Sequence, residues 1–222
     1  MSIQTTIQQI KAELPSSTRL IAVSKYHPSE MIRQAYDAGQ RIFGESHVQE
    51  LQQKVGELPS DIEWHFIGHL QTNKVKYIAP YVSLIHAVDS FRLLQEIEKQ
   101  GARCNRRIRV LLQLHLAQED TKFGLTPEEC DAMLAEGLWR QMPHVDICGI
   151  MCMASNVDDD EQILNEFRAG RQYFEHARQT FFPSQPSFCE CSMGMSDDYP
   201  LAVQQGSTLV RIGSKIFGPR VY

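Results

Sequence analysis

The feature that most constrains the fold of this chain is a regular alternation of short apolar runs with amphipathic segments. Eight runs, most of them rich in Val, Ile, Leu and Phe, are found, and no long polar linker interrupts the series. The runs are LIAVS (20–24), RIF (41–43), EWHFIG (63–68), SLIHA (83–87), RIRVLLQLHL (107–116), VDICGIMC (145–152), SFCECS (187–192) and TLVRIG (208–213). Strands buried on both faces have this composition, and parallel strands need helix-length crossovers. Eight such units predict a closed α/β barrel of the (β/α)8 type.

The segments between the runs carry helix signals. Ser90 precedes the amphipathic segment 91–100 and Gly101 follows it, which predicts a capped helix that stops at Gly101. Thr126 and Pro127 supply an N-cap and a first-turn proline for another helix. The further helices are expected at 29–38, 48–55, 72–81, 158–180 and 197–205. The leading segment, 1–16, predicts an additional N-terminal helix outside the repeat.

The size of the chain agrees with one barrel. A length of 222 residues suits a single domain, predicted over 1–222, with a sizeable core. An open doubly wound sheet is the alternative fold. No GxGxxG motif follows the first apolar run, which weakens the dinucleotide-binding version of that alternative.

Composition excludes several classes of partner. The net charge is −5, so neither nucleic acid nor an anionic membrane is expected as a partner. No apolar run approaches the roughly 20 residues of a membrane span, and the polar N-terminus has no signal-peptide core. The six cysteines form no CxxC pair, so free thiols and no metal site are expected. The chain is predicted to be cytoplasmic.

The residues that follow the apolar runs suggest a ligand site. Active sites of such barrels lie at the carboxyl ends of the strands, and the loops after strands seven and eight commonly bind phosphate. Here these loops read SMGMSDD (192–198) and GSK (213–215). Glycine and serine beside a helix start expose backbone N–H groups that suit a phosphate. Ordinary turns are the alternative for each loop.

Lys25 follows the first apolar run, at the expected mouth of the barrel. A lysine amine condenses with an aldehyde when it is neutral, and desolvation at a barrel mouth favours the neutral form. An aldehyde and a phosphate in one ligand indicate pyridoxal 5′-phosphate (PLP). The alternative is a strand-end lysine in contact with water.

Several longer motifs resemble those of the pyridoxal-phosphate homeostasis protein family. They are AVSKYHP, FGESHVQE, WHFIGHLQTNK, KFG, GIMCMAS and CSMGMSDDYPLAVQQGSTLVRIGSKIFGPR. The resemblance runs from about residue 18 to residue 220. Members of this family look like the barrel domain of alanine racemase standing alone, so the resemblance implies a PLP-binding (β/α)8 barrel.

The resemblance implies roles for individual residues. Lys25 matches the lysine that forms the internal aldimine with PLP. Ser192 matches a serine that touches the phosphate, and Gly213 and Ser214 match the loop that completes the phosphate site. Arg211 matches the arginine that faces the pyridine nitrogen.

Other matching positions border the cofactor. Met193 belongs to the same signature as Ser192. Asn73 belongs to the third-strand motif, and Lys122 belongs to the KxG motif. Ser46 departs from the family pattern, which has asparagine at this position, so a cofactor contact from Ser46 depends on a shorter side chain.

Some polar residues have a simpler interpretation. An ion pair with Asp197 or Asp198 is the structural alternative for Arg211. His65 has no partner pattern and is interpreted as a core or surface residue. Glu45 and Glu190 are expected to be solvated or ion-paired.

Three functions are compatible with the sequence. The favoured one is a non-enzymatic PLP-binding protein in cofactor homeostasis, with PLP-dependent apo-enzymes as possible recipients. A PLP-dependent amino-acid racemase is the alternative, and a phosphate-ligand barrel without PLP is the third. Arginine stays charged and has no acceptor, so Arg211 would keep the pyridine nitrogen unprotonated and weaken the electron sink that racemization needs. The resemblance implies that alanine racemase shares this arginine and compensates with a second base, a tyrosine from a separate C-terminal domain of the partner subunit. The sequence ends at Tyr222, which predicts that this domain and its base are absent and that the protein is a monomer.

Overall fold

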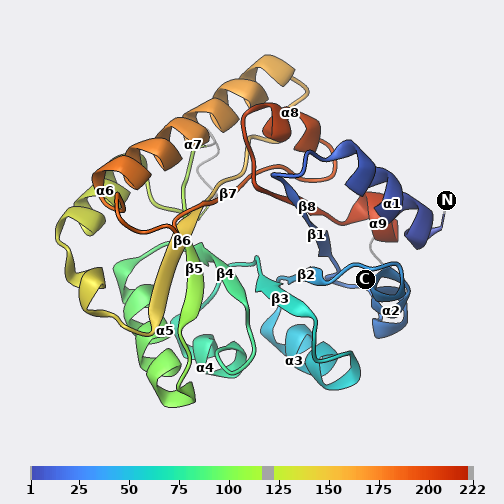
Figure 1. The fold of residues 1–222 in the computed structure, drawn as a ribbon, viewed down its shortest axis with the longest axis horizontal. Helices are drawn as coiled ribbons and strands as arrows, with labels where there is room; N and C mark the ends of the chain where they lie inside the picture. The colour runs from blue at the N-terminus through green and yellow to red at the C-terminus, as the bar shows by residue number, and fades with distance from the viewer. Residues whose placement is uncertain (1, 117–122, 220–222) are drawn as a thin grey trace.

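Eight parallel strands close into one barrel, in which each strand pairs with its sequence neighbours and the last returns to the first (Figure 1). The structure is a computed structural model, which describes residues 2–116 and 123–219. The strands are β1 (Arg19–Val23), β2 (Ile42–Glu45), β3 (Glu63–Phe66), β4 (Leu84–Val88), β5 (Ile108–Gln113), β6 (Val145–Met151), β7 (Glu190–Ser192) and β8 (Leu209–Ile212). Ala22 of β1 pairs with Ile212 of β8 and closes the sheet. The predicted (β/α)8 barrel is confirmed.

The helices lie around the outside of the barrel (Figure 1). They are α1 (Ile3–Glu13), α2 (Ser29–Asp37), α3 (Val48–Glu57), α4 (Val75–Ile78), α5 (Phe91–Cys104), α6 (Pro127–Ala135), α7 (Asp160–Thr180), α8 (Tyr199–Gln204) and α9 (Ser214–Phe217), with 3-10 turns η1 (Thr72–Lys74) and η2 (Leu138–Gln141). The additional N-terminal helix is α1, which packs against α2 and α9. Within the described ranges, no helix has the length and apolarity needed to cross a bilayer.

The boundaries of several elements differ from the prediction. The helix expected at 72–81 is split into η1 and α4, and the seventh strand is confined to Glu190–Ser192. Gly101 does not end its helix, because α5 continues to Cys104 and stops where Asn105 adopts a left-handed conformation with φ 52°. A Cβ on Gly101 would lie 2.9 Å from the Arg106 carbonyl oxygen and 2.9 Å from the His144 Cβ. Glycine at this position therefore permits a close approach and is no stop signal.

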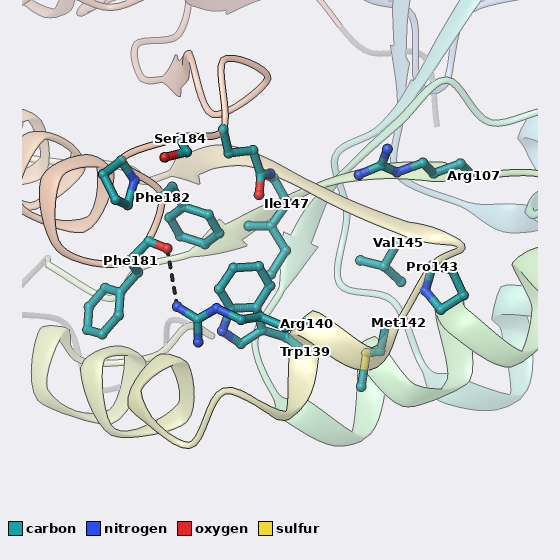
Figure 2. A pocket seen from close by; sticks show the side chains of 12 residues that line it. Arg107, Trp139, Arg140, Met142, Pro143, Val145, Ile147, Phe181, Phe182 and Ser184 are labelled. Carbon is teal, nitrogen blue, oxygen red and sulfur yellow. Dashed lines mark hydrogen bonds between the residues drawn. The ribbon is translucent and has the colours of Figure 1, made fainter.

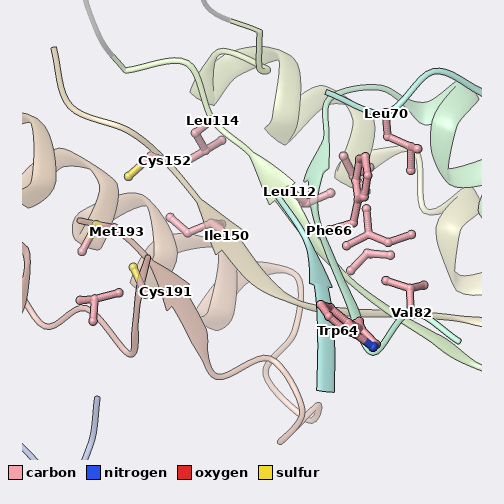
Figure 3. Close-up of a cluster of buried hydrophobic side chains, with 14 of the residues drawn as sticks. Trp64, Phe66, Leu70, Val82, Leu112, Leu114, Ile150, Cys152, Cys191 and Met193 are labelled. Carbon is pink, nitrogen blue, oxygen red and sulfur yellow. The ribbon is translucent and has the colours of Figure 1, made fainter. Parts of the chain in front are cut away.

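Hydrophobic side chains form two separate cores. The outer core lies between the strands and the helices, and Figure 3 shows part of it, including Trp64 and Phe66 of β3 and Leu112 of β5. The inner core consists of residues of the strands and fills the barrel: Ile21, Leu84, Leu111, Cys148, Met151 and Leu209. Side chains alternate along a strand, so every second residue points into the barrel.

A chain of hydrogen bonds between polar side chains also crosses the barrel interior. Arg211 Nη1 lies 2.6 Å from Ser192 Oγ, and His86 Nδ1 lies 3.1 Å from the same oxygen. His86 Nε2 lies 3.0 Å from His65 Nδ1. Arginine only donates, so the Ser192 hydroxyl accepts from Arg211 and can donate to His86, whose Nε2–H then donates to His65. The chain is complete with both histidines neutral.

Burial explains why these histidines are neutral. It lowers the pKa of His65 to about 3, and the positive charges of Arg19 and Arg109 add to the effect. It also holds the pKa of His86 well below its ordinary value. An unfolded histidine has a pKa near 6.5. Between these values the unfolded chain therefore binds protons that the folded barrel excludes.

Replacing His65 with Gln should make the protein less sensitive to acid. A neutral buried histidine stabilises the fold above about pH 6.5, and this contribution is lost as pH falls, by up to about 1.4 kcal/mol per pH unit for each histidine. Between about pH 6 and 4, the free energy of unfolding should fall by about 2–3 kcal/mol less in His65→Gln than in the unsubstituted protein. Urea denaturation at several pH values measures this difference.

Leu84→Ala is the matched control, because Leu84 pairs with His65 across β3 and β4 and lies in the inner core. It should lose about 2–5 kcal/mol at every pH, with an unchanged dependence on pH. An identical pH dependence in His65→Gln and the unsubstituted protein would contradict the prediction.

Candidate functional site

Lys25 lies just beyond the carboxyl end of β1. The ladder between β1 and β2 continues one residue past the strand, because the Ser24 N–H donates to the Gly44 carbonyl over 3.0 Å. Lys25 follows and is half-buried. Tyr26 then adopts a left-handed conformation with φ 66°, which is uncommon for a residue with a side chain. The backbone thus turns sharply at Lys25, at the mouth of the barrel.

The two loops that were predicted to bind phosphate lie side by side. The Gly213 N–H donates to Ser196 Oγ over 3.2 Å, and the Arg211 N–H donates to the Gly194 carbonyl over 2.9 Å. A Cβ on Gly213 would lie 3.0 Å from the Val23 carbonyl oxygen, so this glycine packs against the end of β1. Ser214 is exposed as the first residue of α9. The fold therefore brings Gly213 and Ser214 to the mouth that holds Lys25.

Arg211 extends from the interior toward the carboxyl ends of β6 and β7. Its Nη1 donates to the Ser192 carbonyl over 2.9 Å and to the Ser192 hydroxyl, and its Nη2 donates to the Cys152 carbonyl over 3.1 Å. These partners replace the ion pair with Asp197 or Asp198 that was the structural alternative. Burial lowers the pKa of the guanidinium from its ordinary value, but arginine remains a cation in proteins.

Ser192 and Met193 are both enclosed. The Ser192 hydroxyl is fully buried and is bound to Arg211 and His86. The Met193 side chain belongs to the outer core, and its N–H donates to the Leu209 carbonyl over 3.1 Å. Ser192 thus positions Arg211, and Met193 fixes the start of the β7–α8 loop.

Ser46 and Asn73 follow β2 and β3, the strands next to β1 on the side away from β8. Ser46 is half-buried directly after β2, and a Cβ on Gly68 would lie 2.4 Å from the Ser46 carbonyl oxygen. Asn73 is exposed on η1, in the loop that follows β3. Lys122 lies outside the described residues. Ser46 therefore follows β2 directly, whereas Asn73 lies on the 3-10 turn beyond β3.

A buried ionic cluster that the sequence did not suggest lies behind Lys25. Lys54 on α3 is 4% exposed, and its ammonium lies 2.8 Å from Glu45 Oε1, 2.7 Å from Glu50 Oε1 and 2.8 Å from the Ser24 carbonyl. Glu45 also accepts from the Ser24 hydroxyl over 2.6 Å. Glu50 accepts from the Tyr26 N–H over 2.6 Å. The expectation that Glu45 is ion-paired is confirmed.

One signal of this cluster was present in the sequence. Lys54 lies on the stripe of α3 that also buries Val48 and Leu51, so its spacing places a lysine on the apolar face of the helix. Burial raises the pKa of Glu45 to about 7, against the opposing effect of Lys54. Its second oxygen, Oε2, makes no hydrogen bond to any described residue.

The other end of the barrel contains a cavity. It has a volume of about 630 Å³ and is lined by Arg107, Trp139, Arg140, the start of β6 and the segment 181–185 (Figure 2). Arg140 lies over the Trp139 ring and donates to the Phe181 carbonyl. These residues lie before or at the amino ends of β5, β6 and β7, whereas Lys25 and Gly213 follow β1 and β8, so the cavity lies away from the candidate site.

The groups at the mouth suit an anionic aldehyde. Lys25 offers a primary amine, Arg211 a fixed positive charge, and Gly213 and Ser214 offer a backbone and a hydroxyl donor at a helix start. An amine can bond to a carbonyl carbon, and hydroxyl and N–H donors suit phosphate oxygens. This set of donors fits the ligand that the sequence predicted.

Comparisons with known proteins agree with the fold and with the motifs. The sequence model of the alanine racemase N-terminal domain matches residues 1–221. The pyridoxal phosphate homeostasis protein of Aquifex aeolicus is 37% identical over 92% of this chain and 88% of its own length. The human protein of the same name is 36% identical over 99% of this chain and 83% of its own length.

Solved structures give the same result. PipY of Synechococcus elongatus with PLP bound has a TM-score of 0.86 and 34% identity, covering 98% of this chain and 100% of that one. An alanine racemase from Bartonella henselae has a TM-score of 0.73 and 16% identity over 98% of this chain and 58% of that one, which shows a shared fold. By its match to the domain model and its identity to full-length relatives, this chain belongs to the pyridoxal phosphate homeostasis protein family.

Proposed function

We propose that this protein binds PLP and contributes to its homeostasis as a carrier without turnover of its own. The observation that carries the proposal is the meeting of Lys25 with the loops after β7 and β8 at one barrel mouth, where Gly213 packs against the end of β1. The names of the relatives and the PLP bound to PipY support the same ligand.

Each residue has a role in this proposal. Lys25 holds PLP covalently, as an internal aldimine. Gly213 and Ser214 bind the phosphate, next to the loop fixed by Ser196. Arg211 faces the pyridine nitrogen, and the Ser192 hydroxyl holds Arg211 in place.

Three further residues are assigned to the rim of the site. Ser46 and Asn73 border the cofactor from the loops after β2 and β3. Met193 contributes through the course of its loop, because its side chain lies in the outer core.

The position of Arg211 is compatible with a carrier, because it weakens the electron sink that α-carbon chemistry needs. PLP serves α-carbon chemistry as an electron sink, and the sink is strongest when the pyridine nitrogen is protonated. Two of the Arg211 nitrogens are held by Ser192 and Cys152, and the third, Nε, makes no hydrogen bond to any described residue. A guanidinium donates only, so an Nε–H that met the pyridine nitrogen would keep that nitrogen unprotonated. The racemase remains the second candidate because the family model is that of an alanine racemase domain.

Other features of the carrier follow from the sequence and stay predictions. They are a single PLP-binding domain over 1–222, a monomeric state, a cytoplasmic location and delivery of PLP to PLP-dependent apo-enzymes.

Replacing Lys25 with Ala should abolish the covalent attachment of PLP and leave the barrel folded, because this half-buried side chain lies beyond β1 and outside both hydrophobic cores. After borohydride reduction, mass spectrometry of the unsubstituted protein should place the adduct on the peptide that contains Lys25. Circular dichroism checks the fold of the variant. An adduct found on Lys74 alone would refute the assignment.

Replacing Ser214 with Ala should weaken PLP binding by about 1–2 kcal/mol, because a hydrogen bond to a charged phosphate is lost. Binding of pyridoxal, which has no phosphate, should be weak in both proteins and should not change. Ser187→Ala is the control, since Ser187 precedes β7 at the other end of the barrel and binds Asp146 over 3.0 Å. Titration followed by absorbance measures both ligands. Equal affinity for pyridoxal and PLP would remove the argument for a phosphate site.

Incubation with L-alanine in deuterated water should cause no rapid exchange of the α-proton, because Arg211 weakens the electron sink. NMR at the α-position measures the exchange, and an alanine racemase serves as the positive control. Rapid exchange with loss of stereochemistry that disappears in Lys25→Ala would favour the racemase instead.

A further inference from the structure

The backbone on both sides of Lys25 is held by side chains from other elements. On the preceding side, the Ser24 carbonyl accepts from Lys54 over 2.8 Å, and the Ser24 hydroxyl donates to Glu45 over 2.6 Å. On the following side, the Tyr26 N–H donates to Glu50 over 2.6 Å. Lys54 joins the two sides, because its ammonium also binds both carboxylates. The turn that carries Lys25 is therefore fixed from outside the barrel.

This turn needs support because Tyr26 has a positive φ of 66°. A residue with a Cβ is disfavoured in the left-handed region and persists there when its surroundings hold it. The hydrogen bond from its N–H to Glu50 supplies one such restraint. His47 adds another contact, with its Nε2 lying 3.4 Å from the Tyr26 hydroxyl and its Nδ1 lying 3.5 Å from Glu50.

Burying the Lys54 ammonium costs desolvation free energy that an apolar side chain at this position would not cost. A buried ion pair stabilises a fold no better than well-packed apolar side chains of similar volume, because both charges must be removed from water. All three ammonium donors of Lys54 have acceptors, and one of them is a backbone carbonyl beside Lys25. These directional hydrogen bonds restrain the backbone at residues 24–26, which an apolar side chain at position 54 could not do.

We propose that Lys54, with Glu45 and Glu50, is a positioning residue that fixes the turn of residues 24–26 and so presents the Lys25 amine to the aldehyde of PLP. This inference rests on the proposed function. It predicts that the cluster sets how fast Lys25 bonds to PLP, beyond any effect on the stability of the barrel.

The test uses two variants of the full chain. Lys54→Met/Glu45→Gln removes one positive and one negative charge with little change in volume, and so leaves no buried carboxylate at position 45 without a cation. Glu50→Ala removes the acceptor of the Tyr26 N–H and leaves the pair of Lys54 and Glu45. Arg106→Met is the matched control, because Arg106 donates to the Ala79 and Val82 carbonyls over 2.6 and 2.9 Å at the other end of the barrel.

Two measurements separate positioning from stability. Hydrogen exchange of the protein without PLP should show at least about tenfold faster exchange at the amides of residues 24–27 in both cluster variants. Formation of the Lys25 adduct with PLP, trapped by borohydride at timed intervals, should slow by roughly tenfold to a hundredfold, the loss that a misplaced reacting group produces. Arg106→Met should lose stability in urea with both quantities unchanged.

The outcomes that would overturn the inference are distinct from those that would overturn the function. Normal exchange and a normal rate of adduct formation in either folded cluster variant would refute the positioning role alone. A similar slowing in Arg106→Met would also refute it, because it would show that general destabilisation is sufficient. An unsubstituted protein that forms no adduct on Lys25 would overturn the proposed function together with this inference.

Discussion

The guanidinium of Arg211 links the interior of the barrel to its functional end. Arg211 is 5% exposed, so water solvates its charge little. The guanidinium instead donates hydrogen bonds to the Ser192 carbonyl, the Ser192 hydroxyl and the Cys152 carbonyl. An unpaired buried charge would cost several kcal/mol. The ladder between β7 and β8 has one register pair, Ser192 with Leu209. Arg211 therefore adds side-chain hydrogen bonds between β8 and the end of β7, beside the backbone ladders that join β7 to β6 and to β8.

Much of the fold could be predicted because strands buried on both faces have a distinctive composition. Positions defined by their place after a strand, such as Lys25, Gly213 and Ser214, followed directly from that pattern. The boundaries were less predictable where tertiary packing decides them. Gly101 has the sequence signature of a helix stop, yet it lies inside α5 where the helix meets the segment before β6.

Contacts between distant polar residues could not be predicted from the pattern of strands. The Ser192 hydroxyl binds Arg211 and His86, and no pattern in the sequence brings these three residues together. The burial of Lys54 is not expected from the sequence, because a lysine on an amphipathic helix usually faces water. Its partners come from β2, from α3 itself and from the residue that follows β1, and only the closed barrel brings these together.

The two ends of the barrel use charge in different ways. At the amino ends of β1, β5 and β7, the Glu190 carboxylate is paired with both Arg19 and Arg109. After the strands, the paired charges lie behind Lys25 and hold its backbone, while Lys25 itself is half-buried at the mouth. This difference between the ion pairs at the two ends of the barrel is compatible with the proposed carrier function. If Lys25 bonds to the aldehyde of PLP as proposed, water or another amine can reverse that bond. If Lys54 and its partners fix the turn of residues 24–26 as proposed, that support would lower the entropic cost of forming the bond.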